Sequence, residues 1–147
     1  RRSSDLQNRK YPEQKIYGTS AGIHVRSKSE SMIVYLLHDY KIPFRYESEL
    51  ELGQVTVYPD FTIRHPKTGK LFLWEHLGMV DEPAYRRNAL SKLQLYMEHG
   101  WIPSVNLILT FETKEYPLDM AYVEGLIKDY FVVADCQRDS SLTGQCQ

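Results

Sequence analysis

Two β-rich segments joined by a turn constrain this chain more than any other feature. Residues 58–64 (YPDFTIR) and 71–77 (LFLWEHL) are rich in aromatic and branched apolar side chains, as strands are. Residues 65–70 (HPKTGK) separate them and carry Pro and Gly, a strong turn signal. The pattern predicts an antiparallel hairpin, and a four-residue loop at 66–69 fixes its register.

This register places Asp60 directly opposite Glu75 on one face of the sheet, with Cβ atoms about 5 Å apart. Both acids interrupt otherwise apolar segments, where an unpaired charge is costly. Facing carboxylates repel each other unless a positive group lies between them, and Mg²⁺ or Mn²⁺ prefers carboxylate and water oxygens. The pair therefore indicates a metal site. The alternative is that one acid points to solvent or pairs with Lys70.

The segments around the hairpin predict a mixed sheet flanked by helices. Ser27 and Glu30 have the spacing of a capping box at the start of a helix. The expected elements, in the order α-β-β-β-α-β-α, are a helix over 27–40, strands over 44–52, 58–64 and 71–77, a helix over 82–99, a central strand over 105–110 and a helix over 118–131. The predicted fold class is α/β.

The charge is unevenly distributed, although the net charge is only -1. Seven basic and two acidic residues lie within 1–28, so the remainder carries about -6. This asymmetry is typical of a nucleic-acid-binding arm beside a metal-binding body, and a solvated tail is the alternative. We expect a basic polar arm over 1–22, one domain over 23–136 and a flexible tail over 137–147.

The composition excludes several classes of protein. A chain with 42% hydrophobic and 25% charged residues is typical of a globular domain rather than a disordered chain. Its apolar runs are far shorter than the roughly 18 residues of a spanning helix, so we expect no membrane association. The two cysteines, Cys136 and Cys146, have no zinc-ligand spacing. A cytoplasmic location is expected, and the first residue is Arg, which is compatible with a piece of a larger polypeptide.

A lysine of the predicted helix over 82–99 lies on the face that is expected to cover the sheet. Tyr85, Ala89, Lys92 and Tyr96 follow one another at helical spacing. The Lys92 amine then either points towards the two carboxylates or extends past the sheet edge to water.

Two other candidates each have a structural alternative. Glu30 lies at the margin of the buried face of its helix, where it either caps the helix or completes a metal site from above. His76 alternates to the sheet face opposite Glu75, together with Trp74, and is expected to pack or form hydrogen bonds there.

These features resemble the PD-(D/E)XK nuclease superfamily, which has the restriction-endonuclease-like fold, over residues 24–131. The similar segments are RSKSE at 26–30, PDFTI at 59–63 and WEHLGM at 74–79, which resemble a bacterial and phage branch of nuclease-like domains. The superfamily motif has Lys two residues after the acid, where this chain has Leu77. The helical position of Lys92, with Tyr96 following it, is similar to branches that supply the lysine from this helix.

The resemblance implies a Mg²⁺- or Mn²⁺-dependent endonuclease or phosphodiesterase acting on DNA, with RNA also possible. Its metal ligands would be Glu30, Asp60, Glu75 and the backbone carbonyl of His76, and its catalytic residues Asp60, Glu75, Lys92 and Glu30. Nucleic-acid contacts are expected from Arg26, Lys28 and Tyr96. Because Leu77 replaces the motif lysine, the alternative is an inactive nucleic-acid-binding or docking domain of a larger nuclease or helicase. Either form could be a dimer.

Overall fold

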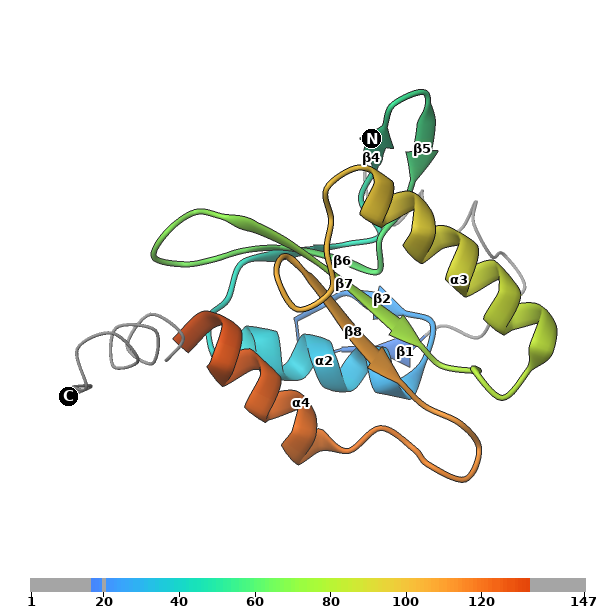
Figure 1. The fold of residues 1–147 in the computed structure, drawn as a ribbon. Helices are drawn as coiled ribbons and strands as arrows, with labels where there is room; N and C mark the ends of the chain where they lie inside the picture. The colour runs from blue at the N-terminus through green and yellow to red at the C-terminus, as the bar shows by residue number, and fades with distance from the viewer. Residues whose placement is uncertain (1–16, 20, 133–147) are drawn as a thin grey trace, which may run out of the picture.

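A four-stranded mixed sheet with helices on both faces forms the centre of the computed structural model, which describes residues 17–19 and 21–132 (Figure 1). The strands lie in the order β3 (Phe44–Tyr46), β6 (Phe61–Arg64), β7 (Leu71–Leu77) and β8 (Leu107–Phe111). β7 and β8 are parallel, and the other neighbouring pairs are antiparallel. The predicted α/β class and α-β-β-β-α-β-α order of the central elements are confirmed.

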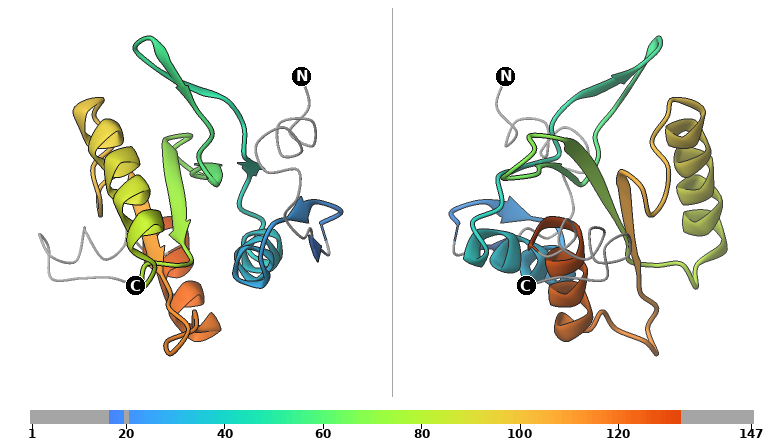
Figure 2. Two further views of the ribbon diagram at one scale, coloured as in Figure 1. Left: turned by 90° about the vertical axis from the view of Figure 1, so that its right-hand side faces the viewer. Right: turned by 60° about the vertical axis from the view of Figure 1, so that its left-hand side comes forward.

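Helices lie on both sides of the sheet (Figure 2), and the sheet separates the hydrophobic core into two parts. One face of the sheet packs on α2 (Lys28–Asp39) and α4 (Met120–Ile127), which continues as a π-helical turn, Lys128–Val132. The other face packs on α3 (Pro83–Glu98). Since side chains alternate along a strand, residues 73, 75 and 77 of β7 lie on the α3 side. Leu73 and Leu77 are buried there with Leu93 and Tyr96 of α3.

The central hairpin has the predicted register. Arg64 pairs with Leu71 and Phe61 with Trp74. The N–H of His65 donates to the Lys70 carbonyl over 2.8 Å, which closes the loop. Gly69 has φ of +74°, a conformation that favours glycine.

The prediction of one strand over 44–52 is wrong, because the chain leaves the sheet after Tyr46. Glu47 has φ of +50°, which breaks the extended backbone. Beyond it, β4 (Leu50–Leu52) and β5 (Val55–Val57) form a separate hairpin, which projects beside the end of α3 (Figure 1). Leu52 buries its side chain in the α3-side core, so the insertion is anchored to the domain.

The expectation of a central strand over 105–110 is also wrong in its placement. Within the described residues, β8 is the last strand of the sheet and pairs with β7. Leu107 and Ile108 are nevertheless buried, because each contributes to the core on one face. Helix cover on both faces, not a central place in the sheet, explains the continuously apolar run.

The predicted boundary between residues 22 and 23 is crossed by strand pairing. β1 (Tyr17–Gly18) pairs with β2 (His24–Val25), so the last part of the predicted arm joins the domain. The rest of that arm through residue 16, and the predicted tail over 137–147, lie outside the described residues. None of the helices in the described ranges combines the length and the hydrophobicity needed to cross a bilayer.

Candidate active site

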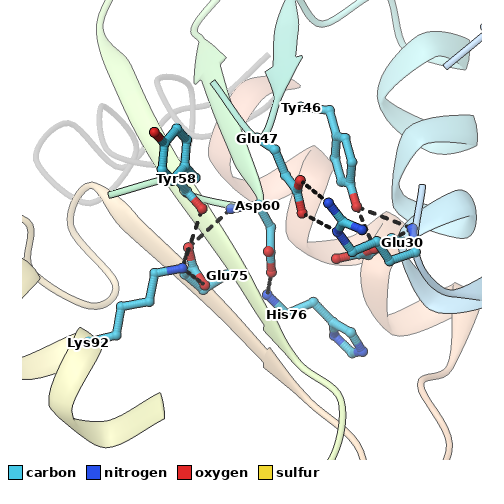
Figure 3. Close-up of polar contacts among 9 residues, drawn as sticks. Glu30, Tyr46, Glu47, Tyr58, Asp60, Glu75, His76 and Lys92 are labelled. Atoms are coloured by element: carbon cyan, nitrogen blue, oxygen red, sulfur yellow. Dashed lines mark hydrogen bonds and ion pairs between the residues drawn. The ribbon is translucent and has the colours of Figure 1, made fainter. Parts of the chain in front are cut away.

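Asp60 and Glu75 lie together on neighbouring strands, as the hairpin register predicts (Figure 3). Asp60 is 8% exposed and Glu75 is 6% exposed. The backbone N–H of Asp60 donates to Glu75 Oε2 over 3.1 Å, and the N–H of His76 donates to Asp60 Oδ2 over 2.8 Å. Each carboxylate therefore accepts a hydrogen bond from the backbone of the opposite strand.

The start of β6 explains this arrangement. Pro59 precedes Asp60, and the paired region of β6 begins only at Phe61. β7 runs on past this point to Leu77, so its backbone at His76 lies beyond the antiparallel ladder. If β6 were longer, one of its backbone carbonyls would accept the hydrogen bond from the His76 N–H. The Asp60 side chain accepts this bond instead.

Lys92 and Tyr96 of α3 both reach Glu75. The Lys92 amine lies 3.1 Å from each Glu75 oxygen and 3.4 Å from the Tyr58 carbonyl. The Tyr96 hydroxyl donates to Glu75 Oε2 over 2.7 Å. Burial and the charge of Glu75 raise the pKa of Tyr96, so this hydroxyl keeps its proton. Lys92 therefore points inward, which is one of the two orientations that the helical spacing allowed.

Tyr96 corrects one expectation. We expected it to contact nucleic acid, but its side chain is fully buried and its hydroxyl is bound to Glu75. It lies behind the carboxylate and orients it, because the last turn of α3 packs directly on the sheet.

A cavity of about 710 Å³ opens over these groups between the sheet end, α2 and α3. Its charged lining residues are five acids and three bases: Glu30, Glu47, Asp60, Glu75, Glu112, Arg26, Lys28 and Lys92. The lining therefore carries an excess of two negative charges if all are ionised. Such a lining favours a cation over an isolated anion.

Glu30 lines the same cavity from α2, and it is held by two donors. The N–H of Arg26 and the hydroxyl of Tyr46 donate to Glu30 Oε1 over 3.0 and 2.8 Å. Ser27 accepts from the Glu30 N–H, so the predicted cap is confirmed, whereas the Glu30 side chain reaches the residue before the cap rather than Ser27 itself. Glu30 therefore belongs both to the N-terminal cap of α2 and to the wall of the cavity.

Arg26 corrects a second expectation, that its side chain contacts phosphates. Its side chain is 6% exposed, and its guanidinium donates to both Glu47 oxygens over 3.0 and 3.1 Å. Burial acts to lower the pKa of Arg26, but the hydrogen bond and charge of Glu47 raise it overall. Its charge is therefore matched inside the protein, whereas Lys28 is exposed at the cavity rim.

A buried polar chain confirms that His76 forms hydrogen bonds on the same face as Trp74, and it includes Thr110 and Glu112, which were not predicted. His76 Nδ1 lies 2.8 Å from the Thr110 hydroxyl, and its Nε2 lies 2.7 Å from Glu112 Oε1. Trp74 Nε1 donates to the same Thr110 oxygen, and Ser29 of α2 donates to Glu112. Burial lowers the pKa of His76, despite the opposing effect of Glu112. The two-residue alternation that places Trp74 and His76 on one face of the sheet also places residues 110 and 112 on that face. This alternation is the sequence signal that could have predicted these hydrogen-bonded side chains.

Leu77, at the position of the motif lysine, lies in the α3-side core. It is 4% exposed and packs in the cluster that contains Leu93 and Tyr96. It lines the cavity with Glu75, whose charge is matched instead by Lys92 from the opposite wall.

The donors at this site suit a hard cation in type. Within the described residues, no three His, Cys, Asp or Glu side chains are grouped closely enough to hold a metal ion. Mg²⁺ commonly takes one or two carboxylates and completes its octahedron with waters and substrate phosphates. The Asp60 and Glu75 carboxylates, beside a cavity wide enough for water, fit that smaller donor set.

The comparisons with known proteins identify a relative whose name states no activity. No family model matches the chain, and no solved structure matches it. A protein of Methanocaldococcus jannaschii named Uncharacterized protein MJ1519 is 33% identical over 92 residues. These residues are 62% of this chain but 8% of that protein, so the chain is similar to a small part of a much longer polypeptide.

Proposed function

We propose that the protein is a metal-dependent nuclease of the restriction-endonuclease-like fold that hydrolyses phosphodiester bonds in DNA. The observation that carries the proposal is the buried pair of carboxylates, Asp60 and Glu75, on adjacent strands beside one cavity. Burying two acids together is costly unless hydrogen bonds, a neighbouring cation or a bound metal offsets their charge. The mixed sheet with α2 before it and α3 between β7 and β8 also agrees with this fold.

In this proposal, Asp60 and Glu75 hold Mg²⁺ or Mn²⁺, with the backbone carbonyl of His76 as a further oxygen donor. The expected third carboxylate ligand, Glu30, is left out, because within the described residues no three such side chains are grouped closely enough to share a metal ion. The bound metal would lower the pKa of a water and neutralise charge on the scissile phosphate. Tyr96 and the Asp60 N–H fix the Glu75 carboxylate, so its orientation is set before substrate arrives. Lys92 places a positive charge where a phosphate would gain negative charge. Lys28, exposed at the rim, would contact a flanking phosphate.

Cleavage of labelled DNA in the presence of excess Mg²⁺ or Mn²⁺ tests the proposal. Asp60→Asn and Glu75→Gln are each expected to reduce cleavage by about 100-fold or more, since each removes a ligand charge. Glu51→Gln is the matched control, because this acid is exposed on β4 away from the cavity. Equal cleavage by all variants would assign the activity to a contaminant and contradict the proposal. A parallel RNA substrate shows which nucleic acid is hydrolysed.

A second candidate is an inactive nucleic-acid-binding or docking domain of a larger nuclease or helicase. Two observations favour it: Leu77 is buried at the motif position, and the Lys92 amine is already paired with Glu75. The length of the Methanocaldococcus jannaschii relative, of which this chain matches 8%, agrees with a domain inside a larger polypeptide. Nucleic-acid binding that is unaffected by Asp60→Asn, without metal-dependent cleavage, would support this candidate over the first.

A further inference from the structure

Two exposed apolar side chains, Met79 and Phe111, lie where β7 and β8 finish, and one of them lines the cavity. Met79, 50% exposed, lines the cavity directly. Phe111, 52% exposed, is the last residue of β8 and pairs in register with Leu77, which also lines the cavity. We call Met79 and Phe111 the apolar lip.

The lip is on the same face of the sheet as the carboxylate of Glu75. Glu75 pairs with Leu109, and Leu77 with Phe111, so alternation directs the Phe111 side chain to the α3 side. The Cα atoms of Glu75 and Phe111 are about 8 Å apart, because Phe111 lies two residues further along and on the neighbouring strand. Stacked nucleotides of one strand are about 3.4 Å apart, so this is roughly two nucleotide steps.

Backbone hydrogen bonds hold the lip in place. The N–H of Glu112 donates to the Leu77 carbonyl over 2.9 Å, and the N–H of Val80 lies 3.4 Å from the Glu112 carbonyl. The N–H of Gly78 donates to the Tyr85 hydroxyl of α3 over 3.0 Å. The segments that carry Met79 and Phe111 are therefore tied to each other and to α3.

A cation lies beside the lip. Arg86 Nη1 donates to the Val80 carbonyl over 2.8 Å, one residue from Met79, and Arg86 is exposed. Surfaces that bind single-stranded nucleic acid combine an exposed aromatic ring, on which a base stacks, with nearby positive charge for the backbone. A base inside a duplex is already stacked on both sides and cannot offer its face to a ring.

We propose that the apolar lip stacks an unpaired base, so that the protein binds single-stranded nucleic acid with its backbone entering the cavity. This inference rests on the proposed function, whose substrate class it narrows. Phe111 supplies the ring, Met79 supplies an apolar side contact, and Arg86 faces the phosphates that follow. Duplex DNA would have to fray before reaching Asp60 and Glu75.

The test measures binding of the full chain to a fluorescent oligothymidylate and to a matched duplex, with Ca²⁺ in place of Mg²⁺ so that a cation offsets the acidic lining of the cavity. The single strand is expected to bind more tightly than the duplex. Phe111→Ala is expected to weaken single-strand binding by roughly 5- to 150-fold, the range for loss of one base–aromatic stack. Phe111→Trp, which keeps a ring, is expected to retain binding. An oligonucleotide carrying 2-aminopurine is expected to lose fluorescence on binding the wild type and less on binding Phe111→Ala.

Tyr122→Ala is the matched control, because Tyr122 is 55% exposed on α4, which packs on the opposite face of the sheet. Thermal melting checks that each variant folds. Unchanged affinity in Phe111→Ala, an equal loss in Tyr122→Ala, no binding by the wild type, or tighter binding of the duplex would each overturn the inference. Metal-dependent cleavage of duplex DNA with Phe111→Ala as active as wild type would retain the proposed function but reject the lip. Single-strand binding that depends on Phe111, without metal-dependent cleavage, would retain the apolar lip but reject the proposed nuclease function.

Discussion

The contact between Lys92 and Glu75 is the interaction in the site whose energy is most directly measurable. Lys92→Met keeps the length of the side chain and removes its charge, while Glu75→Gln keeps the shape of the carboxylate and removes its charge. The side chain of Glu75 is 8% exposed and that of Lys92 is 27% exposed. The pair thus lies between a surface ion pair and a fully buried one.

The expected coupling energy follows from that intermediate burial. Exposed ion pairs contribute about 0–1 kcal/mol, and hydrogen bonds to charged groups about 1.5–3 kcal/mol. Glu75 also retains its hydrogen bonds from Tyr96 and from the Asp60 N–H when Lys92 is changed. We therefore expect a coupling of about 1–2 kcal/mol. For a domain of 147 residues, Lys92→Met alone should lower the melting temperature by about 2–8 °C.

A double-mutant cycle measures this coupling. The four proteins are the wild type, Lys92→Met, Glu75→Gln and the double variant, unfolded in urea with the fluorescence of buried Trp74 as the readout. The double variant should be more stable than the sum of the two single losses indicates. A coupling below about 0.3 kcal/mol, within the usual error of additivity, would show that Lys92 extends to water and that its inward orientation is wrong.

Two further predictions concern polar groups around the cavity. Because burial lowers the pKa of His76 below its ordinary value of about 6.5, the unfolded chain binds a proton that the folded chain does not, and stability falls as pH decreases below about 6.5, down to the lowered pKa. Urea unfolding in EDTA from pH 8 to pH 5 should show this loss in the wild type and a flatter dependence in His76→Asn; parallel curves would refute it. Tyr46→Phe removes the hydroxyl that donates to buried Glu30 over 2.8 Å and should cost about 1–3 kcal/mol of unfolding free energy. Exposed Tyr35→Phe should change it by less than about 0.5 kcal/mol, and equal effects of the two would contradict the role of the Tyr46 hydroxyl.

The facing acids were predictable because a hairpin carries its own register. A turn signal of known length determines which residues pair, and two-residue alternation then determines the face. The same local rules placed Lys92 on the sheet-facing side of α3 and Trp74 with His76 on the other side of β7. These predictions needed no contact between distant segments beyond the packing of α3 on the sheet.

Features that depend on long-range partners were not predictable in this way. The strand over 44–52 ends at Glu47, where φ is +50°; the side chain of Glu47 pairs with Arg26, and its N–H donates to the Asp60 carbonyl over 3.0 Å. Neither partner is near it in sequence. The positive φ of Glu47 and the burial of Arg26 accompany that pairing, and residue-by-residue propensity contains no trace of them.

The hydrogen bonds of the two acids also determine which substitutions can distinguish structure from chemistry. Asp60 accepts from the His76 N–H at the end of the β6 ladder, and an alanine there would remove that acceptor together with the charge. In Asp60→Asn the amide oxygen can still accept this bond, and in Glu75→Gln it can still accept from Tyr96. The amide variants thus preserve the sheet end while they remove the negative charge. Because the fold needs the oxygen atoms and a cation needs the charge, loss of activity in a stably folded amide variant would report on the chemistry of the site.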